Sequence, residues 1–318
     1  MKTFIYKILC FTLLLLLLAY TLQWVFDYNL RKSNCSSNYK EWNDIFDSKI
    51  NADMIIQGNS RAWKHISPGV LDTVLHINSY NLGIDGYNFT MQYYRFLTYL
   101  KYNKKPKYII QTADYITIDK LPYLYSYQQF VPYLYDGTIR EAVSHYEGSD
   151  WRDLYIPFYK YVHNKDLISC AISSCFDKTT PSSNGKYKGY QTQDSQWDRS
   201  FGLFEKNHRN GYVDTIDNPT LRLFDSFVKY CVSNDIRLIF VNSPVYYKAT
   251  KLLRNRKEID SVYLSYSVRY AIPYLNYSND SICFDTLNFY NSQHLNARGA
   301  RKFNVVFAND IKKIVCSN

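Results

Sequence analysis

The chain has 318 residues, of which 46% are hydrophobic, and it carries a formal net charge of +10 at pH 7. This length allows one large α/β domain or two small ones, and the apolar content leaves ample material for a core. The basic residues are spread along the chain, and their densest runs, 101–107 and 248–257, contain no nucleic-acid recognition motif. We therefore expect no nucleic-acid partner, with an anionic lipid surface or an acidic polysaccharide as alternative partners for the basic surface.

The N-terminal segment differs from the rest of the chain in composition. Residues 8–26 carry no charge and include six consecutive leucines, Leu13 to Leu18. A run of this length can span a bilayer. A cleaved signal peptide is the alternative, but no small-x-small cleavage site follows the leucines. We expect an uncleaved signal anchor in residues 1–32, transmembrane at about 8–26, with the membrane as a partner and the body exported to a periplasmic or other extracytoplasmic space.

The chain contains seven cysteines. Cys170 and Cys175 are close in sequence and could form a disulfide if the body faces an oxidising compartment. No C-x-x-C pair and no His/Cys cluster at zinc spacing is present. We therefore expect neither a metal site nor another cofactor.

Strand and helix patterns alternate along most of the body. Residues 33–50 are mostly polar and predict a tether, and the domain is expected to span residues 51–318. Strands are expected at 54–56, at 107–112, at 236–241 and, with its loop, at 80–86; helices are expected to end near Tyr102, to begin near Asn218 and to follow Asn296. This alternation predicts an α/β fold, a mainly parallel sheet between two helical layers.

A large aromatic-rich insertion interrupts this alternation at about 115–217. Its periodicity is weak, and tyrosines crowd the stretches 121–127 and 155–161. Tyrosine rings can stack on sugar faces while their hydroxyls bond sugar hydroxyls, but they can equally pack on one another and on the main core. Both interpretations, a glycan platform and a core, remain open for this segment.

The first strand delivers a serine to a tight turn. Met54, Ile55 and Ile56 stop at Gly58, and Ser60 follows where a helix is expected to begin. A serine at that place is either a helix N-cap or a nucleophile held beside the positive end of the helix. The ends of parallel strands border one crevice, so Gly58, Asp114 and Asn242 should lie near one another.

A histidine near the end of the chain is the candidate partner of Ser60. His294 lies just before the last predicted helix, which Asn296 can cap. A histidine fixed before the last helix of a parallel-sheet domain can reach a serine at an early strand end. Together, Ser60 and His294 predict a nucleophile and its general base.

These segments resemble the blocks of the SGNH (GDSL-like) hydrolase superfamily, particularly its membrane-anchored branch associated with cell-surface polysaccharide acylation. The nucleophile block is similar to 58–61, with Asn59 where Asp is commoner; the second block resembles 81–86, and the last block resembles 294–300. The resemblance implies an SGNH/flavodoxin-like sheet, Ser60 and His294 as catalytic residues, Gly83 as an oxyanion donor, and Asn59 and Arg61 beside the substrate.

Two positions depart from the family pattern. The third block offers an asparagine to the oxyanion, whereas this chain has Asp114, which accepts hydrogen bonds when it is ionised. The aspartate that precedes the family's histidine by three residues is Asn291 here. An amide cannot stabilise an imidazolium by charge. A main-chain carbonyl or Asp285 could orient His294 instead.

Two functions follow from the resemblance. The first is an exported, membrane-anchored esterase or O-acyltransferase that acts on cell-surface carbohydrate through an acyl-enzyme on Ser60, with a membrane acyltransferase as a possible acyl supplier. The second is a catalytically inactive SGNH-like protein that binds glycan or scaffolds a polysaccharide assembly, which Asn291 and Asp114 favour. A third function, binding anionic lipid or nucleic acid through the basic surface, would show steep salt dependence.

Overall fold

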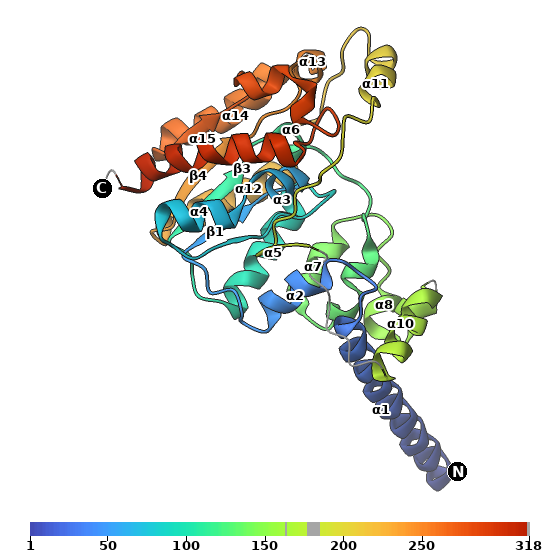
Figure 1. Cartoon of the computed structure of the whole chain (residues 1–318). Helices are drawn as coiled ribbons and strands as arrows, with labels where there is room; N and C mark the ends of the chain where they lie inside the picture. The colour runs from blue at the N-terminus through green and yellow to red at the C-terminus, as the bar shows by residue number, and fades with distance from the viewer. Residues whose placement is uncertain (163, 177–184, 317–318) are drawn as a thin grey trace. The chain divides into compact units, whose positions relative to one another are not determined.

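A computed structural model describes residues 1–316 apart from 163 and 177–184 (Figure 1). The chain divides into two compact units. The first unit combines Met1–Asp47 with the described part of Pro122–Asn184, and the second combines Ser48–Leu121 with the described part of Gly185–Asn318. The insertion expected at about 115–217 is therefore shorter than predicted, because residues 115–121 and 185–217 belong to the second unit.

The second unit is built on a five-stranded parallel sheet with the strand order β2-β1-β3-β4-β5. The strands are β1 (Met54–Gln57), β2 (Ser79–Asn81), β3 (Tyr108–Thr112), β4 (Arg237–Asn242) and β5 (Tyr274–Asn276). β1 is buried along its whole length, as its apolar run predicts, and its Ile55 lies opposite Tyr80 and Ile109. This strand order is that of flavodoxin-like doubly wound sheets. It confirms the predicted α/β fold.

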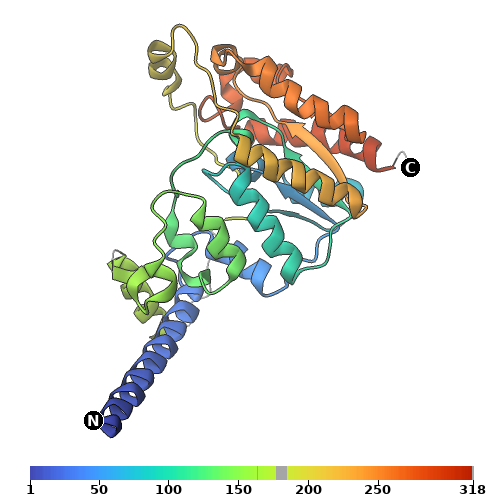
Figure 2. The same cartoon turned by 180° about the vertical axis from the view of Figure 1, so that it is seen from behind.

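Helices cover both faces of this sheet (Figures 1 and 2). The helices of the second unit are α3 (Ser60–His65), α4 (Pro68–Leu75), α5 (Phe89–Tyr102), α6 (Tyr115–Ile118), α11 (Phe201–Asn207), α12 (Asn218–Ser233), α13 (Tyr247–Leu252), α14 (Arg256–Tyr270) and α15 (Ala297–Cys316). On one face, Phe303 and Phe307 of α15 share a core with Ile56 and Ile110. On the other face, the Phe224 ring of α12 lies 5.7 Å from the Phe240 ring of β4.

The segment that follows residue 185 packs on the second unit. The Asn81 N–H donates to the Lys188 carbonyl oxygen at 2.9 Å, and the Lys188 ammonium lies 2.6 Å from Asp72 Oδ2. Further along, the Asp198 N–H donates to the Tyr290 carbonyl oxygen at 2.8 Å. These contacts join segments far apart in sequence, which explains why composition alone placed residues 185–217 in the insertion.

The first unit is helical. Its helices are α1 (Lys2–Lys32), α2 (Tyr39–Phe46), α7 (Gly137–Ser144), α8 (Arg152–Tyr155), α9 (Tyr159–Val162) and α10 (Lys165–Phe176). α1 is long and apolar enough to cross a membrane, and the side chains of its apolar part are exposed. It extends beyond the expected span of 8–26 at both ends, and it fits a signal anchor by length and composition.

Part of the expected tether, residues 33–50, is a packed helix. On α2, Trp42 and Phe46 are buried, and their rings lie 5.8 Å from Phe130 and 4.9 Å from Tyr133 respectively. The two side chains are four residues apart and therefore share one helix face. The serines and asparagines that suggested a tether lie before α2, at 33–38, so the mean polarity of residues 33–50 concealed the apolar face of this helix.

The disulfide differs from the expected pair. Cys170 is bonded to Cys35, which follows the end of α1, whereas Cys175 is a free thiol whose Sγ contacts the Ala171 carbonyl oxygen at 3.2 Å. Cys170 and Cys175 both lie on α10, and five residues of helix turn the second side chain well away from the first. Closeness in sequence therefore gave the wrong pairing.

Candidate active site

Ser60 is the first residue of α3, directly beyond the end of β1. A Cβ on Gly58 would lie 2.0 Å from Thr112 Oγ1, so only glycine lets the chain turn this close to β3. The Asn59 side chain caps the helix, because its Oδ1 accepts a hydrogen bond from the Arg61 N–H at 2.9 Å. Asn59 thus takes the capping role that was the alternative for Ser60, and the Ser60 hydroxyl makes a different contact.

Ser60, His294 and Asn291 form a hydrogen-bonded chain. The Ser60 Oγ lies 2.8 Å from His294 Nε2, and His294 Nδ1 lies 3.0 Å from Asn291 Oδ1. Asn291 Oδ1 also accepts hydrogen bonds from the N–H groups of Gln293 and His294, both at 3.0 Å, which identifies it as the amide oxygen. His294 Nδ1 must therefore carry the proton, and the lone pair of Nε2 faces the Ser60 hydroxyl. This is the tautomer that a general base needs.

Asn59, Arg61 and Asp114 form a buried polar network beneath Ser60. Asp114 Oδ1 accepts a hydrogen bond from Asn59 Nδ2 at 2.9 Å, and Asp114 Oδ2 lies 3.5 Å from Arg61 Nη1. Arg61 Nη2 donates to Asn242 Oδ1 at 2.9 Å. The three strand ends are therefore linked as predicted, with Arg61 as the link. However, all three side chains of the network are at most 4% exposed, so they support the nucleophile turn from within rather than facing a ligand.

His65 and Ser243 hold the loop that carries His294, and neither was a candidate from the sequence. His65 Nε2 accepts a hydrogen bond from the Leu295 N–H at 3.0 Å, so its Nδ1 carries the proton and donates to Ser243 Oγ at 2.8 Å. His65 is fully buried, and burial, together with the charge of Arg61, lowers its pKa well below the usual value. The only sequence signal was a histidine five residues after the serine, which has no meaning until the last loop is placed.

Gly83, the expected second oxyanion donor, lies against α3. A Cβ on it would come within 2.6 Å of the Trp63 backbone nitrogen, so glycine is required for this close packing. Its N–H donates to Asn81 Oδ1 at 2.8 Å. The donor predicted for the oxyanion is thus paired with its own loop here. The Ser60 N–H, in contrast, lies in the first turn of α3, where no intrahelical acceptor exists.

Asp285, the acidic alternative for orienting His294, has other partners. Its Oδ1 accepts a hydrogen bond from the Leu287 N–H at 2.9 Å, and its Oδ2 lies 3.8 Å from Arg298 Nη2. Asn291 is the side chain that contacts His294 Nδ1. The orienting group is therefore neutral.

The electrostatic environment keeps His294 neutral. Burial is the main cause, and the positive charges of Arg61 and Lys64 add to it; together they lower the pKa of His294 to about 4. A carboxylate at position 291 would counter this effect, but the Asn291 amide does not. His294 can therefore accept a proton at any pH above about 4, and its protonated form is poorly stabilised.

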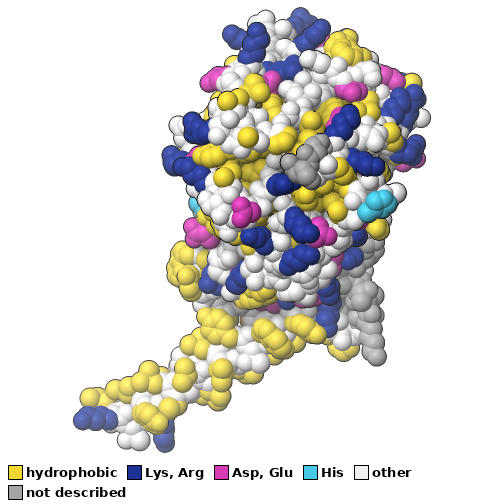
Figure 3. Space-filling model, turned by 90° about the vertical axis from the view of Figure 1, so that its left-hand side faces the viewer, with side chains coloured by type: hydrophobic (Ala, Val, Ile, Leu, Met, Phe, Trp, Pro, Cys, Tyr) yellow, Lys and Arg dark blue, Asp and Glu magenta, His cyan; other side chains and the backbone are white. Residues whose placement is uncertain are grey.

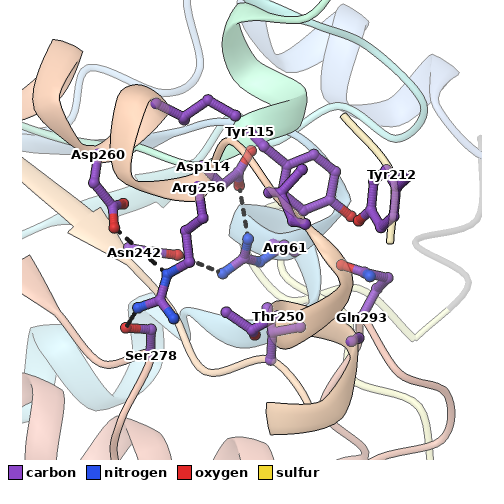
Figure 4. A pocket seen from close by; sticks show the side chains of 14 residues that line it. Arg61, Asp114, Tyr115, Tyr212, Asn242, Thr250, Arg256, Asp260, Ser278 and Gln293 are labelled. Carbon is purple, nitrogen blue, oxygen red and sulfur yellow. Dashed lines mark hydrogen bonds and ion pairs between the residues drawn. The ribbon is translucent and has the colours of Figure 1, made fainter. Parts of the chain in front are cut away.

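A small cavity lined by both polar and aliphatic side chains lies beside Arg61 (Figure 4). Its volume is about 40 Å³, which holds a few water molecules. Arg256 lines it: its Nε lies 3.5 Å from Asp260 Oδ2, and its Nη2 donates a hydrogen bond to Ser278 Oγ at 2.7 Å. A sugar does not fit in this volume.

A larger cleft of about 580 Å³ lies beside Asn291. Its walls are formed by aromatic, aliphatic, hydroxyl and amide side chains: Tyr115, Ser200, Phe201, Leu203, Phe204, Asn207, Tyr212, Asn291, Ser292 and Gln293. This volume is typical of small-molecule sites, and neutral polar groups between aromatic rings suit a hydroxyl-rich ligand. Tyr115 and part of the segment 185–217 supply these rings, so some of the aromatic residues of the expected insertion line a cleft.

Within the described residues, no group of three or more His, Cys, Asp or Glu side chains could hold a metal ion. The site residues are one hydroxyl, one imidazole, one amide and the ion pair of Arg61 with Asp114. The chemistry that these groups can perform is proton transfer to and from a serine nucleophile.

Comparisons with known proteins give structural likenesses. No protein-family model and no curated protein sequence matches the chain. Solved structures similar to it include three that are described as a lipolytic protein, an acylhydrolase and a lipase. One is assigned to the G-D-S-L family, from Desulfitobacterium hafniense, with 13% identity, a TM-score of 0.39, and coverage of 80% of this chain and 97% of that one.

The other two are an acylhydrolase from Bacteroides fragilis and a GDSL-like lipase from Bacteroides thetaiotaomicron. The first has 11% identity, a TM-score of 0.38, and coverage of 82% of this chain and 86% of that one. The second has 13% identity, a TM-score of 0.40, and coverage of 87% and 98%. The Desulfitobacterium hafniense and Bacteroides thetaiotaomicron proteins are described as GDSL proteins, the type that the sequence motifs resemble.

The fold and the site of this chain define its class by themselves. It is a doubly wound α/β protein that presents a hydrogen-bonded Ser60–His294–Asn291 chain at the carboxyl edge of a parallel sheet. An apolar helix, α1, precedes this fold.

Proposed function

We propose that the chain is an exported, membrane-anchored serine esterase or O-acyltransferase of the SGNH type that acts on acylated cell-surface carbohydrate. The observation that carries this proposal is the 2.8 Å contact between Ser60 Oγ and the unprotonated nitrogen of His294. Nucleophile and base are thus in contact, and the base has the correct tautomer. The neutral aromatic cleft beside Asn291 supports carbohydrate as the substrate class.

The reaction would proceed through an acyl-enzyme. Ser60 Oγ attacks the acyl carbonyl carbon while its proton passes to His294 Nε2; the bond to the sugar oxygen then breaks as that proton moves to the leaving hydroxyl. Water releases the acyl group as a carboxylic acid, whereas a second sugar hydroxyl takes it as a new ester. The Ser60 N–H is placed to stabilise the oxyanion, and Gly83 can join it only by exchanging its bond to Asn81.

Labelling by a fluorophosphonate probe tests the nucleophile. The full-length protein in detergent should be labelled, and the Ser60→Ala variant should not. Ser265→Ala, which removes an exposed hydroxyl on α14, is the matched control and should label as the unmodified protein does. Equal labelling of the Ser60→Ala variant would remove the nucleophile from the proposal.

The substrate class has its own test in the aromatic cleft. Phe204→Leu removes a ring that lines the cleft and leaves Ser60, His294 and Asn291 unchanged in sequence. It should raise KM for an acetylated oligosaccharide and leave a small aryl acetate unaffected. An equal effect on both substrates would show that the cleft does not bind sugar.

The reaction type is tested by comparing acyl transfer to an added sugar with release of free acid, since the first product indicates a transferase and the second a hydrolase. For a transferase, we propose a membrane acyltransferase as the acyl supplier.

A second function is favoured by the closed state of the site. Ser60 is only 7% exposed, and the Gly83 N–H is already bonded. A catalytically inactive glycan-binding or scaffolding protein would retain these features. It would bind oligosaccharide with an affinity that Phe204→Leu lowers, and it would resist the fluorophosphonate probe entirely.

A further inference from the structure

Helix α1 makes hydrogen bonds and an ion pair with the rest of the first unit. The Tyr20 hydroxyl donates to the Tyr155 carbonyl oxygen at 2.6 Å, and the Phe158 N–H donates to Gln23 Oε1 at 2.5 Å. One turn further along α1, Asp27 is buried, and its Oδ2 lies 2.7 Å from Lys160 Nζ. The rest of the first unit therefore contacts α1 over two turns, from Tyr20 and Gln23 inside the apolar run to Asp27 directly after it.

Two more contacts join α1 and the residues that follow it to the rest of the first unit. The Tyr161 hydroxyl donates to Asp27 Oδ1 at 2.6 Å, and the Cys35–Cys170 disulfide ties α10 to the residues that follow α1. Figures 1 and 2 both show α8 and α10 beside this end of the helix. The depth of α1 in a bilayer consequently sets the depth of the segment 151–158.

Large apolar side chains are exposed at this place. Trp151 and Tyr155 are each 64% exposed and Ile156 is 41% exposed, while Tyr20 and Trp24 on α1 are 44% and 65% exposed. We call these five residues the apolar collar. Figure 3 shows hydrophobic side chains along the projecting helix itself. The apolar collar thus extends the apolar surface of α1 onto α8 and the residues beside it.

The length of α1 determines where the collar lies. Tyr20 is six residues before Phe26, and at about 1.5 Å per residue this is roughly 9 Å inside the end of the apolar run. If Tyr20 lay clear of the bilayer, the uncharged stretch from Ile8 to Ala19 would cover only about 18 Å, well short of the roughly 30 Å hydrocarbon layer. Spanning the bilayer therefore brings Tyr20, and Tyr155 with it, at least as deep as the membrane interface.

We infer that the apolar collar docks into the interfacial layer of the bilayer that α1 enters, so that the first unit is a second, monotopic membrane contact. Tryptophan and tyrosine are the side chains that favour this layer, because their rings are apolar and their polar atoms reach the headgroups. This inference rests on the proposed membrane anchoring but not on the proposed esterase activity. A second copy of the chain or another protein is the competing occupant of the collar.

Quenching of tryptophan fluorescence by brominated lipid tests the inference. The full-length protein is placed in phosphatidylcholine nanodiscs, with or without bromine on the acyl chains near the headgroup. The emission of Trp151 is obtained as the difference between the unmodified protein and Trp151→Phe, and that of Trp24 as the difference from Trp24→Phe. Far-UV circular dichroism confirms that each variant is folded.

We expect brominated lipid to remove half or more of the emission of both tryptophans. Quenching of Trp24 without quenching of Trp151 would overturn the collar while leaving the anchor in place, and it is also the result expected if another protein covers the collar. Quenching of neither would overturn the membrane anchoring as well. Fluorophosphonate labelling of the same samples reports on the esterase proposal separately.

Discussion

A buried ion pair lies among the described residues of each unit, Lys160 with Asp27 and Arg61 with Asp114, and the two pairs differ in how well their polar atoms are satisfied. In the first unit, Lys160 and Asp27 lie 2.7 Å apart, and the Val131 carbonyl oxygen accepts a further hydrogen bond from Lys160 at 3.0 Å. In the second unit, Arg61 and Asp114 lie 3.5 Å apart, and Arg61 Nε has no hydrogen-bond partner among the described residues.

We interpret this as a difference between a contact that stabilises the fold and a contact that supports the candidate active site. The pair at the end of α1 has the short, fully bonded geometry that a buried charge needs to be tolerated. The pair beneath Ser60 is longer, and Arg61 divides its contacts between Asp114, which follows β3, and Asn242 at the end of β4. Imperfectly satisfied polar groups are typical of sites that perform chemistry. The comparison predicts that mutations near Arg61 affect activity, whereas mutations near Lys160 affect stability alone.

Removal of the base should have the largest effect. His294→Ala eliminates the acceptor of the Ser60 proton, and we expect fluorophosphonate labelling to slow by about 10²–10⁴-fold, the range of general-base contributions. Labelling rates measured at neutral pH test this. His145→Ala, an exposed histidine of the first unit, is the control. An unchanged rate for the His294 variant would exclude it as the base.

Breaking the ion pair of the first unit should have the next largest effect. Lys160→Met leaves the Asp27 carboxylate buried and unpaired, which should lower the free energy of unfolding by about 3–5 kcal/mol. Adding Asp27→Leu removes the orphaned charge and should recover most of this loss. Thermal unfolding of full-length protein in detergent measures both. Labelling of Ser60 should be unaffected at temperatures where the variant remains folded, and a loss there would contradict the division of roles.

An acidic residue at position 291 tests how the neutral Asn291 side chain affects His294. Asn291→Asp places a negative charge about 3 Å from His294 Nδ1, and a carboxylate at that distance raises a histidine pKa by about 1–3 units. Aryl-acetate turnover should increase, since the imidazolium formed in the transition state is then stabilised.

The pH profile of the same variant supplies its check. If the proposed esterase activity is present, the unmodified protein should keep it down to about pH 4, because His294 with its pKa of about 4 stays unprotonated, whereas the variant should lose it at a higher pH. Identical acid limits in both proteins would mean that position 291 does not act on His294.

The sequence predicted the parts of this molecule that depend on local patterns. The apolar runs of β1, β3 and β4 and the glycine at position 58 gave the sheet and the nucleophile turn, and the order of the motifs paired Ser60 with His294. The sequence could not predict which polar atoms would meet across the fold. The contacts of His65 with Leu295 and of Gly83 with Asn81 depend on loop geometry.

The first unit shows the same limit more strongly. The Cys35–Cys170 and Asp27–Lys160 pairs each join residues more than a hundred positions apart. No local pattern indicates either pair. Mean polarity also concealed α2, because its buried face consists of a few aromatic and aliphatic side chains in a polar segment.

The smallest expected effect is the acid sensitivity that His294 gives to the second unit. Its pKa is about 4 in the folded chain and near 6.5 in the unfolded chain, so the unfolded state binds more protons between these values. The contribution of neutral His294 to the free energy of unfolding is therefore fully present above about pH 6.5 and is lost as the pH falls toward 4. At pH 5.5 the loss is about 1 kcal/mol. His294→Gln should flatten this part of the pH dependence of the unfolding midpoint but not abolish it. The remaining slope should come from His65, whose pKa is lowered by burial in the same core. If the slope is unchanged in His294→Gln, His294 is not held neutral by its surroundings, and the assignment of a poorly stabilised imidazolium fails with it.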